Sequence, residues 1–175
     1  MQNAVRAWLL GWAIAVAPGA SAQPLQLLVG ARGGVAAPNE LAFDPGPMVG
    51  VDGAYGMQRL VALELVVEQS FHPVMRPTGT VRGTATVAMV GIQYRLDITP
   101  AAVPYAVLAI ESRWMHVSGE GTRNFPGGAF GLGILAPLGL NWFAGVEARF
   151  GITPQGGFPL RQAYLVRLGY RTAGF

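Results

Sequence analysis

Hydrophobic and polar residues alternate with a period of two along most of the chain after residue 24. The alternation comes in segments of about ten residues separated by Gly, Pro, Asn or Asp, and no helical stripe competes with it. The eight segments cover residues 25–35, 48–56, 60–69, 82–96, 104–117, 128–136, 141–152 and 161–170. We therefore expect an all-β protein built from eight antiparallel strands.

The two faces of each expected strand differ in character. One face carries aliphatic and aromatic side chains, as in residues 60–69, where alternate positions are Val or Leu. The opposite face carries Gly, Gln, Glu and Arg, and in the same segment it holds Glu64 and Glu68. Because a tilted strand of about 9 to 11 residues crosses a bilayer, an apolar outside around a polar inside predicts an up-and-down transmembrane β-barrel.

The connections between these segments alternate between long and short. The long ones are residues 36–47, 70–81, 118–127 and 153–160, and the shorter ones are 57–59, 97–103 and 137–140. With both chain termini in the periplasm, every long connection would face outward, as outer-membrane barrels require. His72 falls in a long connection beside Pro73 and Pro77, where we expect a solvated histidine.

Aromatic residues on the apolar faces favour the membrane barrel over a soluble alternative. A soluble calycin-like ligand-binding barrel would turn its apolar face inward. Aromatic residues near the ends of strands instead suit a girdle at the lipid headgroups. The girdle that we expect comprises Tyr94, Trp114, Trp142, Phe150, Tyr164 and Tyr170.

Residues 1–22 are typical of a secretory signal peptide. Arg6 supplies the positive charge, the apolar run of residues 7–17 is too short to span a membrane as a helix, and residues 20–22 (Ala-Ser-Ala) match a cleavage site. The barrel domain is then expected over residues 23–175. The chain contains no cysteine, which excludes disulfides and thiolate sites and fits export into a Gram-negative envelope.

Composition agrees with a membrane barrel and argues against several other functions. Hydrophobic residues make up 51% of the 175 residues and charged residues only 12%, and Gly occurs 25 times. All 12 basic residues are Arg, scattered without a cluster, so the net charge of +3 does not indicate nucleic-acid binding. We expect no cofactor and no metal site, because the glycine-rich residues 128–133 lie within a strand and no metal-ligand spacing occurs.

With these features the chain resembles the small eight-stranded outer-membrane proteins of the OmpA, OmpX and OmpW type, and proteins described as an outer membrane protein beta-barrel domain. The resemblance covers residues 25–175. It rests on the alternating strands, on the sequence Pro-Tyr-Ala-Val-Leu-Ala at residues 104–109, and on a terminal strand followed by Phe175. Phe175 stands five residues after Tyr170 and hence out of register, so a bulge at residues 172–174 is needed to complete the assembly signal.

The resemblance implies a location in the bacterial outer membrane, contacts with outer-membrane lipids and lipopolysaccharide, and assembly by the barrel insertion machinery. We expect a monomer, although the pattern itself does not fix the oligomeric state. We also expect no enzymatic activity. The role implied is structural, surface contact or passage of small solutes, carried by the outer loops.

Charged residues on the inward faces nearly balance one another. Arg32, Asp52 and Arg171 are among them, and a narrow lumen makes each charge costly unless it is paired. We therefore predict a lumenal network of arginines and carboxylates that fills and stiffens the barrel. Its expected members are Glu64, Glu68, Arg95, Glu111, Arg113, Glu147, Arg149 and Arg167.

One His and Ser pair offers an enzymatic alternative. His116 and Ser118 lie two residues apart near the outer end of a strand, and they resemble the His-x-Ser pair of outer-membrane lipid A deacylases, which are also eight-stranded barrels. That resemblance implies Ser118 as nucleophile, His116 as base and Glu120 as the orienting acid. Gly119 stands where that family has Asn, and three strands follow here, so we expect no catalytic role for the pair.

Overall fold

The computed structural model describes residues 26–38, 43–58, 60–96, 101–154 and 160–172. The expected signal peptide and Phe175 lie outside the described residues. No helix in the described part of the chain is both long enough and apolar enough to cross a membrane.

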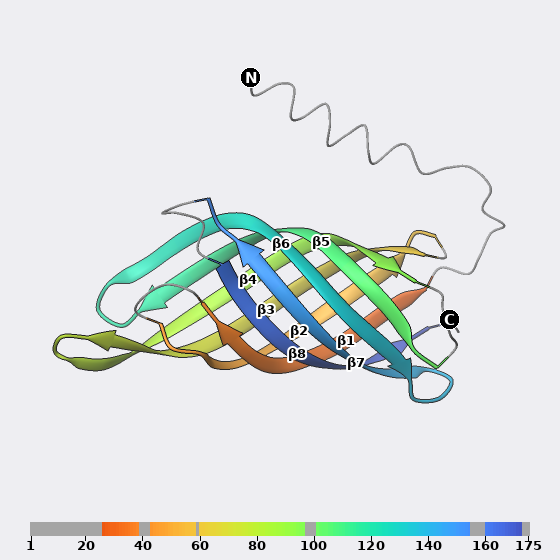
Figure 1. Cartoon of the computed structure of the whole chain (residues 1–175), viewed down its shortest axis with the longest axis horizontal. Coiled ribbons are helices and arrows are strands. Elements are labelled where there is room, and N and C mark those ends of the chain that lie inside the picture. Colours follow the sequence, from red (N-terminus) through yellow and green to blue (C-terminus); the bar gives the residue numbers. More distant parts are fainter. Residues whose placement is uncertain (1–25, 39–42, 59, 97–100, 155–159, 173–175) are drawn as a thin grey trace, which may run out of the picture.

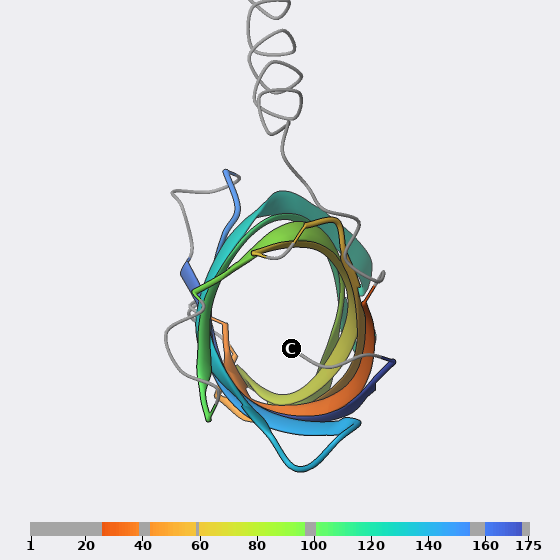
Figure 2. The same ribbon diagram turned by 90° about the vertical axis from the view of Figure 1, so that its right-hand side faces the viewer.

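Eight strands form one closed antiparallel barrel in the order β1 to β8, which confirms the predicted fold (Figures 1 and 2). The strands are β1 (Leu27–Ala37), β2 (Gly46–Gly56), β3 (Val61–Arg76), β4 (Gly79–Arg95), β5 (Val103–Val117), β6 (Gly121–Pro137), β7 (Trp142–Ile152) and β8 (Leu160–Arg171). Seven of the eight pairings join strands adjacent in sequence, and the pairing of β1 with β8 closes the barrel.

The outward and inward faces alternate as the sequence predicts. On β3, for example, Leu65 and Val67 are each 53% exposed, whereas Glu64 and Glu68 are 0% and 1% exposed. A strand has a side-chain period of two, so one register places Leu65 and Val67 outside and Glu64 and Glu68 inside, together with Val66.

The barrel has two unlike ends. We call the end where β1 begins and β8 ends the terminal end, and the opposite one, where the β3–β4 and β5–β6 hairpins project, the hairpin end (Figure 1). The outward aromatic residues lie toward both ends. Those toward the terminal end are Tyr94, Trp142 and Tyr170, and those toward the hairpin end are Trp114, Phe150 and Tyr164.

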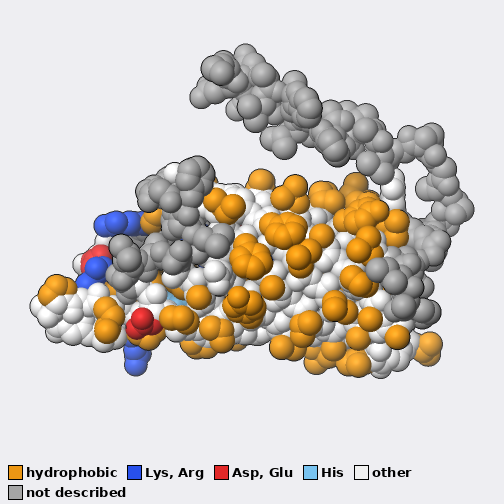
Figure 3. Space-filling model, viewed as in Figure 1, with side chains coloured by type: hydrophobic (Ala, Val, Ile, Leu, Met, Phe, Trp, Pro, Cys, Tyr) orange, Lys and Arg blue, Asp and Glu red, His pale blue; other side chains and the backbone are white. Residues whose placement is uncertain are grey.

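An apolar band covers the outside of the barrel between these ends. Figure 3 shows hydrophobic side chains over the barrel and charged side chains gathered at the hairpin end. Toward the hairpin end polar residues appear among the outward positions, as at Gln69, Thr84 and Asn124, beside the apolar Phe71 and Met75. A soluble barrel would expose no such band, so the calycin-like alternative is wrong.

Two of the expected long loops are in fact tight hairpins. The β3–β4 ladder continues to the pair Arg76 and Gly79, and the β5–β6 ladder continues to Val117 and Gly121. Proline in the first of these segments had suggested a loop. Pro73 is nevertheless tolerated. Its carbonyl points away from β4 and accepts a hydrogen bond from Asp44 N, 3.0 Å away. The backbone nitrogen of a strand residue lies on the same side as its carbonyl, so the missing N–H costs the β3–β4 ladder no bond.

Candidate functional site in the barrel lumen

The lumen is lined by buried charged side chains. Seven arginines and five carboxylates lie there, each no more than 6% exposed. The arginines are Arg32, Arg95, Arg113, Arg149, Arg161, Arg167 and Arg171, and the carboxylates are Asp52, Glu64, Glu68, Glu111 and Glu147. Charges this deeply buried are stable only when they are paired and hydrogen-bonded.

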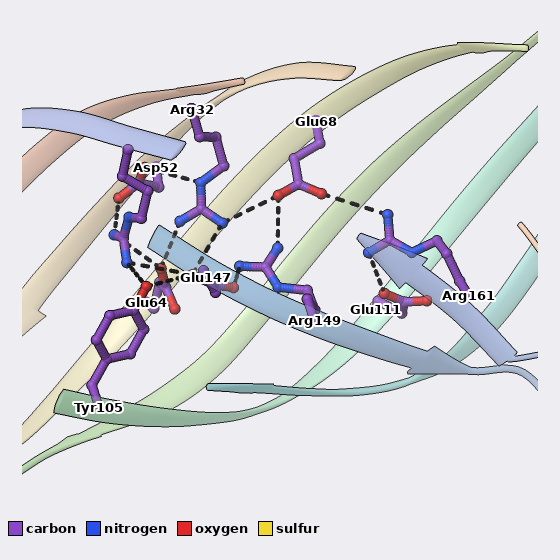
Figure 4. Close-up of polar contacts among 10 residues, drawn as sticks. Arg32, Asp52, Glu64, Glu68, Tyr105, Glu111, Glu147, Arg149 and Arg161 are labelled. Carbon is purple, nitrogen blue, oxygen red and sulfur yellow. Dashed lines mark hydrogen bonds and ion pairs between the residues drawn. The ribbon is translucent and has the colours of Figure 1, made fainter. Parts of the chain in front are cut away.

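Arg32 of β1 is the centre of the ion pairs. Its Nε lies 3.0 Å from Asp52 Oδ1, its Nη2 lies 2.8 Å from Glu64 Oε1, and its Nη1 lies 3.1 Å from Glu68 Oε1 (Figure 4). One guanidinium thus holds carboxylates from both β2 and β3. Each nitrogen has its own oxygen partner, a use of the planar fork that an ammonium group cannot reproduce.

Two further arginines extend the pairs toward the hairpin end. Arg149 Nη1 lies 2.7 Å from Glu68 Oε1, and the same guanidinium also pairs with Glu147 of its own strand. Arg161 of β8 bridges Glu68 Oε2 at 3.5 Å and Glu111 Oε2 at 3.2 Å. Figure 4 shows Arg161 lying between these two carboxylates, so the chain of alternating charges runs along the lumen.

Arg167 and Tyr105 extend the same system toward the terminal end. Arg167 pairs with Asp52 and lies 3.2 Å from Glu64 Oε1. It also donates to Tyr105 Oη at 2.9 Å, and Tyr105 donates in turn to Glu147 Oε2 at 2.7 Å. The connected side chains come from β1, β2, β3, β5, β7 and β8, so the network ties six strands together across the lumen.

Inward glycines give the charged side chains their room. A Cβ on Gly151 would lie 2.6 Å from Glu111 Oε1, and a Cβ on Gly131 would lie 3.1 Å from Glu147 Oε1. The many glycines on the inward faces therefore have a steric reason, because a narrow barrel has little space once arginine and glutamate side chains enter it.

One expected network member, Arg95, lies apart from the central ion pairs of the described residues. Arg95 donates to the side-chain oxygens of Gln93, at 2.8 Å, and Gln26, at 3.3 Å. Arg113 lies over the Phe125 ring, with 5.6 Å between Cζ and the ring centroid, and within 3.5 Å of Thr153 Oγ1. Alternation places both residues in the lumen, but it does not determine which partner each one meets.

Other central residues were absent from the expected network. Alternation puts Arg32 and Asp52 on inward faces, but neither they nor Arg161 and Tyr105 were predicted as members of the network. The alternation places Arg161 in the lumen, because it is six residues before Arg167 on β8 and therefore on the same face. What the sequence lacks is the stagger between strands, which sets the height of each residue in the barrel.

His72 is buried, so the expectation of a solvated loop histidine is wrong. It points into the hairpin end of the lumen and is 3% exposed. Its Nδ1 lies 3.0 Å from the Asp44 carbonyl oxygen and therefore donates, which leaves Nε2 to accept from the Ser70 hydroxyl at 2.8 Å. Phe43 packs edge-on against the ring at 5.9 Å. His72 thus anchors the β1–β2 connection inside the mouth of the barrel.

We expect His72 to make stability depend on pH. Burial, together with the charges of Arg113 and Arg161, holds the pKa of His72 below its ordinary value of 6.5, although the Asp44 carbonyl opposes this. Between the lowered pKa and 6.5 the unfolded chain binds more protons, so the free energy of unfolding decreases as the pH falls through 6.5.

Urea unfolding in detergent micelles at several pH values measures this dependence. The variant His72→Gln should show a flatter pH profile than the wild type. His116→Gln, which changes an exposed histidine, should keep the wild-type profile. Equal slopes for His72→Gln and the wild type would contradict the assignment.

The expected His and Ser pair does not form a dyad. His116 faces outward, and its Nδ1 lies 3.2 Å from Thr122 Oγ1 on the neighbouring strand. Ser118 lies in the turn after β5, where its backbone N donates to the Arg82 carbonyl at 3.1 Å. Glu120 pairs with Arg76 of the other hairpin. The three residues therefore serve three different contacts.

No family model and no curated protein matches the chain in sequence. Solved structures match it in fold. OprG from Pseudomonas aeruginosa aligns with a TM-score of 0.63 and 12% identity, over 86% of this chain and 96% of that one. Neisserial surface protein A, NspA, aligns with a TM-score of 0.61 and 13% identity, over 87% and 98%. Ail, the attachment invasion locus protein of Yersinia pestis, gives 0.60 and 11%, over 85% and 99%.

These similarities establish the fold. The chain has the architecture of the small eight-stranded barrels of bacterial outer membranes. Its continuous apolar band and its enclosed charges are what that setting requires, because lipid surrounds the outside and side chains fill the inside. Together they describe a membrane-spanning barrel with the fold of these outer-membrane proteins.

Proposed function

We propose that this barrel is a non-enzymatic surface protein that makes contacts through its hairpin end. The single observation that carries the proposal is the distribution of exposed charge. Among the described residues, every ionisable side chain of Asp, Glu or Arg that is not buried lies at the hairpin end (Figure 3). These residues are Asp44, Arg76, Arg82, Glu120 and Arg123.

Polyanionic glycans are the partner class that this end supports best. Arg76 pairs with Glu120 and links the two hairpins, whereas Arg82 and Arg123 are exposed and have no ion-pair partner among the described residues. Unpaired arginines suit phosphate and sulfate groups, including those of lipopolysaccharide. In support, Ail of Yersinia pestis has been solved in complex with the heparin analogue sucrose octasulfate.

The filled lumen argues against passage of solutes. Arg32, Arg149, Arg161 and Arg167 connect strands on several sides of the barrel by direct ion pairs. An eight-stranded barrel has an interior that side chains can fill completely. The proposed protein is therefore a closed monomeric barrel that is inserted by the barrel assembly machinery and held by outer-membrane lipids, with surface contact as its task.

Binding of proteoliposomes to immobilised heparin tests the proposal. The double variant Arg82→Gln with Arg123→Gln should bind several-fold more weakly than the wild type and should depend less on salt, because exposed charge pairs are screened by ions. The charge-retaining double variant Arg82→Lys with Arg123→Lys should keep most of the binding. Equal binding by the glutamine variant and the wild type would overturn the proposal.

Recording in planar bilayers separates this role from solute passage. The closed barrel should show no steady open level. A steady open level in the wild type would favour the small-solute role instead, and it would also show that the lumenal ion pairs leave a continuous path.

A further inference from the structure

Arg95 differs from the four arginines of the central ion pairs in lacking a carboxylate partner among the described residues. It is 4% exposed and lies at the last position of β4. Its Nε donates to Gln93 Oε1 at 2.8 Å and its Nη1 to Gln26 Oε1 at 3.3 Å. Both acceptors are neutral amides, so they satisfy hydrogen bonds without neutralising the buried charge.

Two donors beside this charge have no acceptor in the described part of the chain. They are Arg95 Nη2 and Gln93 Nε2. Gln93 is 0% exposed, and its Oε1 is already turned toward Arg95. Buried donors are almost always hydrogen-bonded in folded proteins, so a pair of unmatched donors around a cation indicates an acceptor that the described residues do not supply.

The lumenal carboxylates are committed elsewhere. Glu64 is held by Arg32 at 2.8 Å and by Arg167 at 3.2 Å. Glu147 accepts from Tyr105 at 2.7 Å and pairs with Arg149. Glu64 Oε2 accepts no hydrogen bond, but no carboxylate of the described residues lies within ion-pair distance of Arg95. Since Arg95 lies at the terminal end, an acceptor would approach from the compartment on that side.

We propose that Arg95 and Gln93 form a binding site for a phosphate-like oxyanion at the terminal end of the lumen. An oxyanion accepts from both unmatched donors and balances the guanidinium charge. The site is independent of the surface contacts proposed for the opposite end. The phosphate group comes either from a free anion of the adjacent compartment or from a phospholipid headgroup of the near leaflet.

Calorimetric titration of the folded barrel with inorganic phosphate tests the site. The protein is held in maltoside micelles, which carry no phosphate, and sodium chloride keeps the ionic strength constant. We expect saturable binding of a single phosphate per chain. Arg95→Gln should weaken it about tenfold or more, because it removes the charge-assisted bonds.

Gln93→Leu provides a second variant that keeps the charge and removes a donor, and it should weaken binding several-fold. Gln69→Leu, which makes the same change on the outer surface of β3, should bind phosphate as the wild type does. Folding of every variant is checked by heat-modifiable gel migration. Absence of saturable binding, or equal affinity in the wild type and both lumenal variants, would overturn the site.

A second measurement in phospholipid nanodiscs identifies the source of the phosphate group. Binding of inorganic phosphate that persists in nanodiscs assigns a free anion as the occupant. Binding that is present in micelles and lost in nanodiscs assigns a phospholipid headgroup, which then competes for Arg95. Either result supports the same recognition chemistry.

Discussion

Arg32→Met should lower the free energy of unfolding by about 3 to 5 kcal/mol, the cost of leaving buried charges without a partner. The reason lies in the number of carboxylates that depend on this one guanidinium. Asp52, Glu64 and Glu68 all lie within 3.1 Å of it. Asp52 and Glu64 would retain Arg167, but the three arginines left in the ion-pair network would face its five carboxylates.

Urea unfolding in micelles, followed by tryptophan fluorescence, measures this loss. Arg82→Met is the matched control, because it removes an exposed arginine with no ion pair in the described chain, and it should change stability by less than about 0.5 kcal/mol. Adding Asp52→Asn to Arg32→Met should recover part of the loss, since it removes one stranded charge. Equal unfolding midpoints for the two methionine variants would show that the network does not stabilise the fold.

Gly34→Ala should prevent the barrel from closing. Gly34 of β1 lies against β8, and a Cβ there would be 2.9 Å from the Tyr164 carbonyl carbon and would overlap the carbonyl oxygen. Both atoms belong to the backbone of β8, so no side-chain rotation relieves the overlap. We expect a loss of more than about 3 kcal/mol, at the upper end of the cost of overpacking.

Heat-modifiable migration reports closure directly, and Gly34→Ala should remain mostly in the unfolded position. The neighbouring substitution Gly33→Ala is the control. A Cβ on Gly33 would face outward, 3.7 Å from the Met48 carbonyl oxygen, which is an ordinary contact. Gly33→Ala should therefore fold like the wild type, and comparable folding of Gly34→Ala would contradict the steric reading.

The sequence predicts the face of a residue well and its partner poorly. Parity alone places Glu147 and Arg167 inside and Tyr164 outside, because a strand allows only two faces. It could not pair Arg161 with Glu111, since these residues come from β8 and β5 and meet only across the lumen. The partner depends on strand tilt and stagger, which are properties of the closed barrel.

At its hairpin end β3 is also longer than the sequence pattern predicts. Residues 70–76 were assigned to a loop because they contain Pro73 and precede Pro77, although Phe71 and Met75 continue the outward apolar positions. Pairing nevertheless continues, because antiparallel ladders need backbone partners and not an apolar face. The burial of His72 was missed for the same reason, because alternation predicts an inward or outward side only for residues assigned to a strand.

The neighbour-to-neighbour order of the strands also bears on how the barrel assembles. Each pairing from β1–β2 to β7–β8 joins segments close in sequence, so these contacts have short loop closures and a small entropic cost. The β1–β8 pairing joins the two ends of the domain and has by far the largest sequence separation of the eight pairings. We therefore expect an open sheet before closure, and we expect the pairing of its two free edges, β1 with β8, to be the slow step of folding.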